Sequence, residues 1–192
     1  MKKNILWVTA LIAAYKHLAR AVEACKQTSE SLALSGFYDC DTLGLIQKLM
    51  DCNARAEGYL NAKVLVDRTL EKLPLRYARI LYLRARFNMT MEDISLKLGY
   101  SKRSTFRWYA EGLKKAACVL KADGYDDRWF EERYAKDVII GDFYSQAEKG
   151  ADVFGRVGKL SDSKKLRLRL EDAVAAGLLL SDKRVANIGC GD

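Results

Sequence analysis

The sequence predicts an all-α protein. Only one of its 192 residues is proline, and hydrophobic residues make up 49% of the chain, which is enough to form a buried core. Alanine, leucine, lysine and arginine favour helices and are plentiful. Apolar residues also recur three and four positions apart over several long stretches. We therefore expect packed amphipathic helices with little or no sheet.

The N-terminal stretch predicts one long amphipathic helix that ends near Leu32. Its apolar side follows a spacing of four and three that continues beyond the most apolar run. The positions on this side are Trp7, Leu11, Ala14, Leu18, Ala21 and Cys25.

The same stretch resembles a secretory signal peptide, because two lysines precede an apolar run and Ala19-Arg20-Ala21 resembles a cleavage site. However, Lys16, His17 and Arg20 place charge between that run and the cleavage site. The run is also too short to span a bilayer. We therefore expect a cytoplasmic protein that keeps this helix and does not enter a membrane.

A second long helix is predicted over residues 42–72, after a loop at residues 35–41 that contains glycine, serine and two aspartates. Two long helices joined by a short loop favour an antiparallel hairpin, which would occupy residues 1–73. Its role is either to support the rest of the protein or to mediate homodimerisation or partner binding. The heptad-like positions are Leu45, Leu49, Cys52, Ala56, Tyr59, Val66 and Leu70, with Lys63 as the one misfit.

Residues 74–121 predict three shorter helices, at about 75–87, 91–98 and 102–121. Pro74 suits the start of the first helix. Thr90 can cap the second helix, with Asp93 three positions later, and Gly99 can end it with a positive φ. Ser101 can then cap the third helix.

The third helix has two distinct sides. Thr105, Trp108, Gly112 and Ala116 are spaced to face inward. On the opposite side lie Arg103, Arg107, Ala110 and Lys114.

The net charge of +8 is concentrated in this central segment. Residues 1–73 carry +2, residues 74–121 carry +8 and residues 122–192 carry −2. Basic residues often only form a solvated surface. Here they coincide with a paired-helix pattern, which favours a polyanion as the partner.

The motif resembles the helix-turn-helix of sigma-70 region 4 and of sigma-like phage regulators. The resemblance includes Leu73-Pro74, the helix start at Thr90, the stretch from Ile94 to Gly99, and the basic helix from Ser101 to Lys115. The sequence departs from that family at Ser95, Tyr100 and Trp108, where the family usually has a small alanine, a small aliphatic residue and an aliphatic core residue, respectively. The resemblance implies double-stranded DNA as a partner, with RNA polymerase as a further candidate.

Arginine can bond to guanine, serine and phenylalanine can contact base edges, and lysine can neutralise phosphates. Thr105 and Trp108 are assigned to the core. Arg84 and Arg86 are further candidates for backbone contact. The predicted DNA-binding residues are Ser101, Lys102, Arg103, Ser104, Phe106, Arg107, Lys114 and Lys115.

Residues 122–192 predict a C-terminal helical region with a glycine-rich linker. Helical spacing over residues 126–147 predicts packing against the hairpin, and a last helix is expected at residues 162–180. The linker at residues 150–160 matches neither phosphate-loop nor dinucleotide-binding glycine spacing. The positions expected to pack in the first stretch are Trp129, Phe130, Tyr134 and Val138.

Enzymatic chemistry is not predicted. The chain has one histidine and five cysteines without a Cys-x-x-Cys pair. The sequence therefore predicts no metal site, no cofactor site and no group of catalytic residues. The preferred interpretation is a sequence-specific transcription regulator from a phage or bacterium. The main alternative is a DNA-packaging protein of the small terminase subunit type, and an exported helical protein is the weakest reading.

Overall fold

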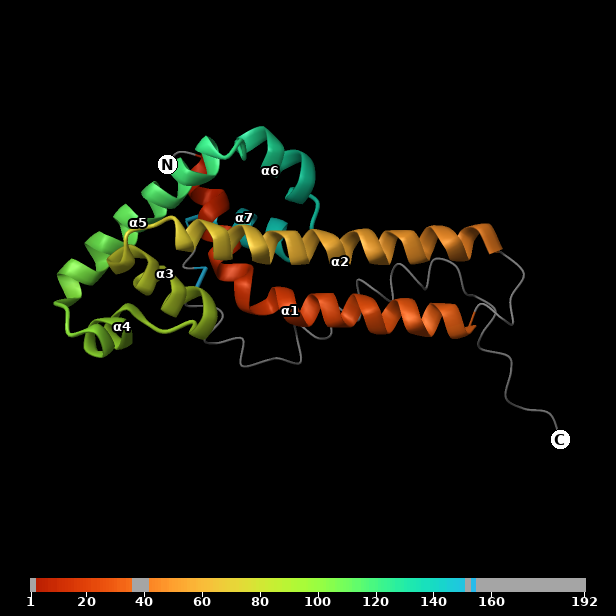
Figure 1. Cartoon of the computed structure of the whole chain (residues 1–192), viewed down its shortest axis with the longest axis horizontal. Helices are drawn as coiled ribbons and strands as arrows, with labels where there is room; N and C mark the ends of the chain where they lie inside the picture. Colours follow the sequence, from red (N-terminus) through yellow and green to blue (C-terminus); the bar gives the residue numbers. More distant parts are fainter. Residues whose placement is uncertain (1–2, 36–41, 151–152, 155–192) are drawn as a thin grey trace. The chain divides into compact units, whose positions relative to one another are not determined.

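The computed structural model describes residues 3–35, 42–150 and 153–154. Within these residues it contains seven α-helices and no strand, which confirms the predicted all-α class (Figure 1). Residues Met1–Gly158 form one compact unit. The second unit, Lys159–Asp192, contains the predicted helix at residues 162–180 and lies outside the described residues.

Helices α1 (Lys3–Ser35) and α2 (Thr42–Glu71) form the predicted antiparallel hairpin (Figure 1). The Tyr15 hydroxyl of α1 donates a hydrogen bond of 2.6 Å to Asp67 Oδ1 near the end of α2. Lys63 also binds Asp67, at 3.2 Å, and its ammonium lies 5.6 Å from the Tyr15 ring centroid. These contacts explain how the inner side of α2 accommodates a lysine.

Helix α1 is the central helix of the unit and contacts α2, α3, α5, α6 and α7. All six apolar positions predicted for its inner side are buried. Trp7 stacks on Tyr144 with ring centroids 3.8 Å apart and on Phe130 at 5.7 Å. The segment Lys3–Leu34 is long and apolar enough to cross a membrane, but 61% of its most apolar window is buried inside the protein. Its hydrophobicity is therefore accounted for by core packing.

Helices α3 (Leu75–Phe87), α4 (Met91–Leu98) and α5 (Lys102–Ala122) begin and end within one residue of their predicted bounds. Ile80, Leu83, Met91 and Ile94 form a buried cluster between α3 and α4. Trp108 and Tyr109 of α5 pack against this cluster. The three helices therefore share one small core.

The stretch after α5 differs from the single helical spacing predicted over residues 126–147. It forms α6 (Asp127–Tyr134) and α7 (Ile140–Glu148). The break occurs because Asp137 Oδ1 accepts hydrogen bonds from the amides of Ile139 and Ile140, at 2.9 and 2.7 Å, and so starts a new helix.

Val138 lies in this break and is exposed, so its predicted packing role was wrong. Phe130 and Tyr134 are buried, and the Tyr134 hydroxyl donates to the Gly58 carbonyl of α2 at 3.2 Å. The predicted packing of this stretch against the hairpin is therefore observed through α6.

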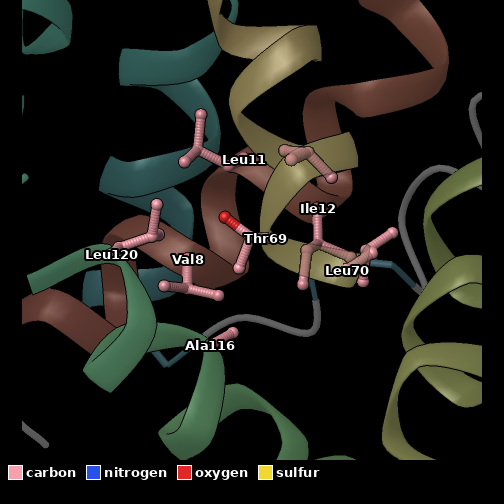
Figure 2. A pocket seen from close by; sticks show the side chains of 8 residues that line it. Val8, Leu11, Ile12, Thr69, Leu70, Ala116 and Leu120 are labelled. Carbon is pink, nitrogen blue, oxygen red and sulfur yellow. The ribbon is translucent and has the colours of Figure 1, made fainter. Parts of the chain in front are cut away.

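A small apolar pocket lies where α1, α2 and α5 meet (Figure 2). Thr69 contributes the oxygen seen in the figure, and its hydroxyl donates to the Leu65 carbonyl at 2.7 Å. The lining offers no charged group to hold a polar ligand, so we regard the pocket as a packing gap between the hairpin and α5. It is lined by Val8, Leu11, Ile12, Val66, Thr69, Leu70, Ala116 and Leu120.

Candidate nucleic-acid interface

Capping residues fix the start of α4 and the turn between α4 and α5. The Thr90 hydroxyl accepts from the Asp93 amide at 3.1 Å, and the Asp93 carboxylate accepts from the Thr90 amide at 3.3 Å, which together form a capping box. Gly99 ends α4 with φ of 68°, a conformation that favours glycine. The Ser101 hydroxyl accepts from the Ser104 amide at 3.1 Å and so begins α5.

An aromatic pair closes this turn. The rings of Tyr100 and Trp108 meet edge to face with their centroids 4.8 Å apart. The guanidinium of Arg76, from α3, lies 5.6 Å from the Trp108 ring centroid. Two of the three residues that depart from the sigma-70 region 4 pattern are therefore neighbours, and each provides the other with an aromatic contact.

The two sides of α5 are those predicted from the sequence. On the inner side Thr105 and Ala116 are buried and Trp108 is half-buried. Gly112 brings α5 close to α3, because a Cβ atom there would lie 3.4 Å from both Leu81 Cδ1 and Tyr77 Cβ. The outer residues Arg103, Arg107, Ala110 and Lys114 are all exposed.

The structure brings the eight predicted DNA-binding residues onto one helix and its cap. Ser101 and Ser104 bond each other, with 2.9 Å between their hydroxyl oxygens, so both take part in the cap. Lys102 forms an ion pair of 2.5 Å with Glu92 of α4. The side chains of Lys102, Arg103, Phe106, Arg107, Lys114 and Lys115 are exposed, and Ser104 is half-buried.

Two arginines of this set have guanidinium groups that are unpaired among the described residues. Within the described part of the chain, Arg103 and Arg107 have neither a hydrogen-bond nor an ion-pair partner. They lie four residues apart on the same side of α5, about one helical turn from each other. Their guanidinium groups are therefore available to a ligand in solution.

The acidic residues of the central segment are held by intramolecular contacts. Lys102 binds the Glu92 carboxylate and lowers its pKa. Asp93 belongs to the capping box, and Glu111 accepts a hydrogen bond of 3.0 Å from the Tyr77 hydroxyl. The acids therefore do not pair with the outward arginines of α5.

Arg84 does not lie where a phosphate contact needs it. Its side chain is buried, its Nη1 donates to the Met89 carbonyl, and its guanidinium lies 4.1 Å from the Phe154 ring centroid. The sequence expectation for Arg84 was therefore wrong, because this position of α3 faces the core. Arg86 is exposed beside the rings of Tyr82 and Phe87.

Arg76 is a basic residue of the interface region that the sequence analysis did not single out. It is exposed near the start of α3, and its Nη2 donates to the Tyr77 hydroxyl at 2.9 Å. Its position in the basic segment, residues 74–121, could have identified it as a candidate. Its proximity to α5, however, depends on how α3 crosses that helix. Among the described residues, no group of three or more His, Cys, Asp or Glu side chains could hold a metal ion.

Residues 63–115 match the family model for sigma-70, region 4. The protein contains a sigma-70 region 4-like helix-turn-helix domain. The match extends from the last turns of α2 through α3 and α4 into α5. Searches of curated proteins and of solved structures found no match.

The sigma-70 region 4-like domain confirms the resemblance inferred from the sequence. Domains of this family bind DNA, and they do so with the second helix of the helix-turn-helix, which here is α5. The domain also contains part of the hairpin, because its first matched residues belong to α2.

Proposed function

We propose that the protein is a sequence-specific transcription regulator that binds double-stranded DNA through α5, in the cytoplasm of a bacterium or of a phage-infected cell. The observation that carries this proposal is the pair of outward arginines, Arg103 and Arg107, on the second helix of the sigma-70 region 4-like domain. A major groove admits an α-helix, and arginine is the side chain that most often reads guanine there. Catalysis forms no part of this function.

The two ends of α5 have different proposed contacts with DNA. Its N-terminal half would contact bases through Arg103, Arg107 and Phe106, with Ser104 beside them. Lys114 and Lys115, near the other end, would contact phosphates and position the helix. Ser101 would mainly preserve the start of α5, and Lys102 would exchange its Glu92 partner for a phosphate.

The experiment is selection of bound duplexes from a random pool, with the full chain as bait and an Arg103→Ala/Arg107→Ala variant as control. We expect a recurring motif for the wild type and none for the variant. Affinity for the selected duplex should fall steeply as salt increases, because phosphate contacts release counterions. A bound pool without any recurring motif would instead favour the packaging protein.

RNA polymerase is the second proposed partner. Domains of the sigma-70 region 4 family bind it, and this domain exposes the large apolar side chains of Tyr82, Phe87 and Leu96 on α3 and α4. Exposed apolar side chains of this kind are typical of protein contacts. Leu96→Lys should weaken binding to purified polymerase in a fluorescence titration without changing DNA affinity, and unchanged polymerase binding would contradict this contact.

We also propose that residues 1–73 mediate homodimerisation and that residues 74–121 bind DNA. The support for dimerisation is that α2 exposes several large apolar residues along one side. A symmetric dimer would present two DNA-binding helices, as other helix-turn-helix proteins do.

A further inference from the structure

Helix α2 has a second heptad pattern in addition to the one that faces α1. Seven positions spaced three and four apart follow a side of α2 that borders the side packed on α1, and all seven are exposed. Five of them are large and apolar: Leu43, Ile46, Met50, Leu60 and Val64 are 81%, 47%, 61%, 51% and 37% exposed, respectively. The two polar members, Asn53 and Glu57, lie at its centre. We name these seven residues the outer stripe.

The outer stripe has the length and period of a coiled-coil interface. It covers residues 43–64, about 33 Å at the rise of an α-helix. An alternating spacing of three and four residues is that of the a and d positions of a heptad, whose side chains pack between the helices of a coiled coil. The positions that face α1, such as Tyr59 and Val66, belong to a different side of α2 and are already buried. The outer stripe is therefore a separate exposed surface that a second helix could cover.

A second copy of α2 running in the opposite direction is complementary to the outer stripe. In an antiparallel coiled coil each a position faces a d position of the other helix. With the two-fold axis at Arg55, Ile46 faces the partner's Val64 and Met50 faces the partner's Leu60. At the centre, Asn53 faces the partner's Glu57. Four of the five apolar residues thus face each other and the two polar residues face each other, while Leu43 lies at the end of the interface, opposite the partner's residue 67.

The central polar pair is chemically matched. Asn53 accepts a hydrogen bond of 3.5 Å from Ser29 through its Oδ1, so its amide nitrogen can donate to the partner's Glu57 carboxylate. Gln47, Ala54 and Asn61 on one flank of the stripe carry no charge, and Lys63 on the other flank is paired with Asp67. A polar pair at one place in an apolar interface also fixes its register.

A parallel arrangement is less favourable for a specific reason. In a parallel pair, a positions face a positions, so Glu57 would meet the partner's Glu57 inside the interface. Two like charges that are shielded from water repel each other, and both would also lose hydration. The charge pattern of the outer stripe therefore selects the antiparallel arrangement.

We propose that the protein forms an antiparallel dimer in which the outer stripes of two α2 helices pack against each other. This makes specific the proposed dimerisation through the hairpin, and it does not depend on DNA recognition. The partner is a second copy of this chain, and the contact residues on α2 are separate from those on α5.

The first test is the mass of the full chain in sedimentation equilibrium. The wild type should give twice the 21.7 kDa of the single chain. Leu60→Glu should raise the dimer dissociation constant about 100-fold or more, because each dimer would contain two buried charges facing the partner's Met50. Val138→Glu, at an exposed apolar position outside the stripe, should leave the dimer unchanged. A monomeric wild type, a larger assembly, or a dimer insensitive to Leu60→Glu would overturn the proposal.

The second test determines the direction of the helices by charge rescue. Met50→Lys and Leu60→Glu should each disrupt the dimer, and the double variant should restore it, because every introduced lysine then faces a glutamate of the partner. In a parallel dimer the double variant would place lysine against lysine and would stay monomeric, which would overturn the antiparallel arrangement. Circular dichroism of each variant confirms that the helices are intact.

DNA titrations test the proposed regulator function independently of the proposed dimer. A monomeric Leu60→Glu variant should still bind a duplex with a single half-site as well as the wild type does. Absence of specific DNA binding in a dimeric wild type would refute the regulator and leave the outer-stripe dimer intact. The reverse result, specific binding by a protein that is always monomeric, would refute only the dimer.

Discussion

Two arginines of α3 that are two residues apart, Arg84 and Arg86, have different environments. Arg84 is buried and donates to the Met89 carbonyl in the connection between α3 and α4. Arg86 is exposed beside two aromatic rings. The same side-chain chemistry therefore supports the fold at one position and is available to solvent at the other.

We expect Arg84→Ala to lower the free energy of unfolding by about 2 kcal/mol, because the Met89 carbonyl would lose a charged donor and the Phe154 ring its cation contact. Arg86→Ala is the matched control and should change the stability by less than about 0.5 kcal/mol. Urea unfolding monitored by circular dichroism measures both. Equal effects of the two substitutions would contradict the structural role of Arg84.

Residue-level predictions from the sequence succeeded where spacing alone decides the environment. The inner and outer sides of α5 follow from its 3.6-residue period, so Thr105 and Arg107 were assigned correctly. The burial of Arg84 and the contact between Tyr100 and Trp108 depend on how helices cross. Helix crossing is a tertiary property that local spacing does not encode.

At the level of the elements, helix ends were predictable when the capping residue was visible. Thr90, Gly99 and Ser101 each perform the predicted function. The separation of α6 from α7 was missed, since no glycine or proline marks it and the residue that holds the start of α7 is Asp137, whose carboxylate accepts from the amides of Ile139 and Ile140. An aspartate within an apolar spacing is easily taken for a surface residue of one continuous helix.

Two helical glycines provide a matched test of packing. A Cβ at Gly141 would lie 2.8 Å from the Ala135 carbonyl oxygen and 2.9 Å from that of Tyr134, whereas one at Gly58 would meet nothing within 4 Å. Gly141→Ala should therefore destabilise the protein by about 1 to 3 kcal/mol, since backbone must move. Gly58→Ala should stabilise it by roughly 0.5 to 1 kcal/mol through helix propensity. Thermal unfolding measures both, and a stabilising Gly141→Ala would contradict the close approach.

At the level of the whole molecule, α1 connects the hairpin, the DNA-binding domain and the C-terminal helices. His17 of α1 stacks on Phe143 of α7, with ring centroids 5.9 Å apart. Its Nε2 is buried and has no hydrogen-bond partner among the described residues. Burial, followed by the charges of Lys16 and Arg20, lowers the pKa of His17 to about 4.

This environment predicts acid sensitivity. Between pH 6.5 and about 4 the unfolded chain binds a proton at His17 that the folded protein does not bind, so stability should fall as the pH decreases through this window. His17→Gln removes the titration and should flatten the profile there. Urea midpoints at pH 7, 6 and 5 for both proteins measure the difference, and parallel profiles would show that His17 does not contribute.

The most direct test of DNA reading by α5 is a titration of four proteins against a selected duplex and a scrambled duplex at one salt concentration. The proteins are the wild type and its Arg103→Ala, Arg107→Ala and Lys114→Ala variants. We predict that each arginine variant loses about 1 to 3 kcal/mol on the selected duplex and much less on the scrambled one. Lys114→Ala should weaken both equally, since phosphate contacts carry no sequence information. Equal losses on the two duplexes for both arginine variants would contradict sequence recognition by α5.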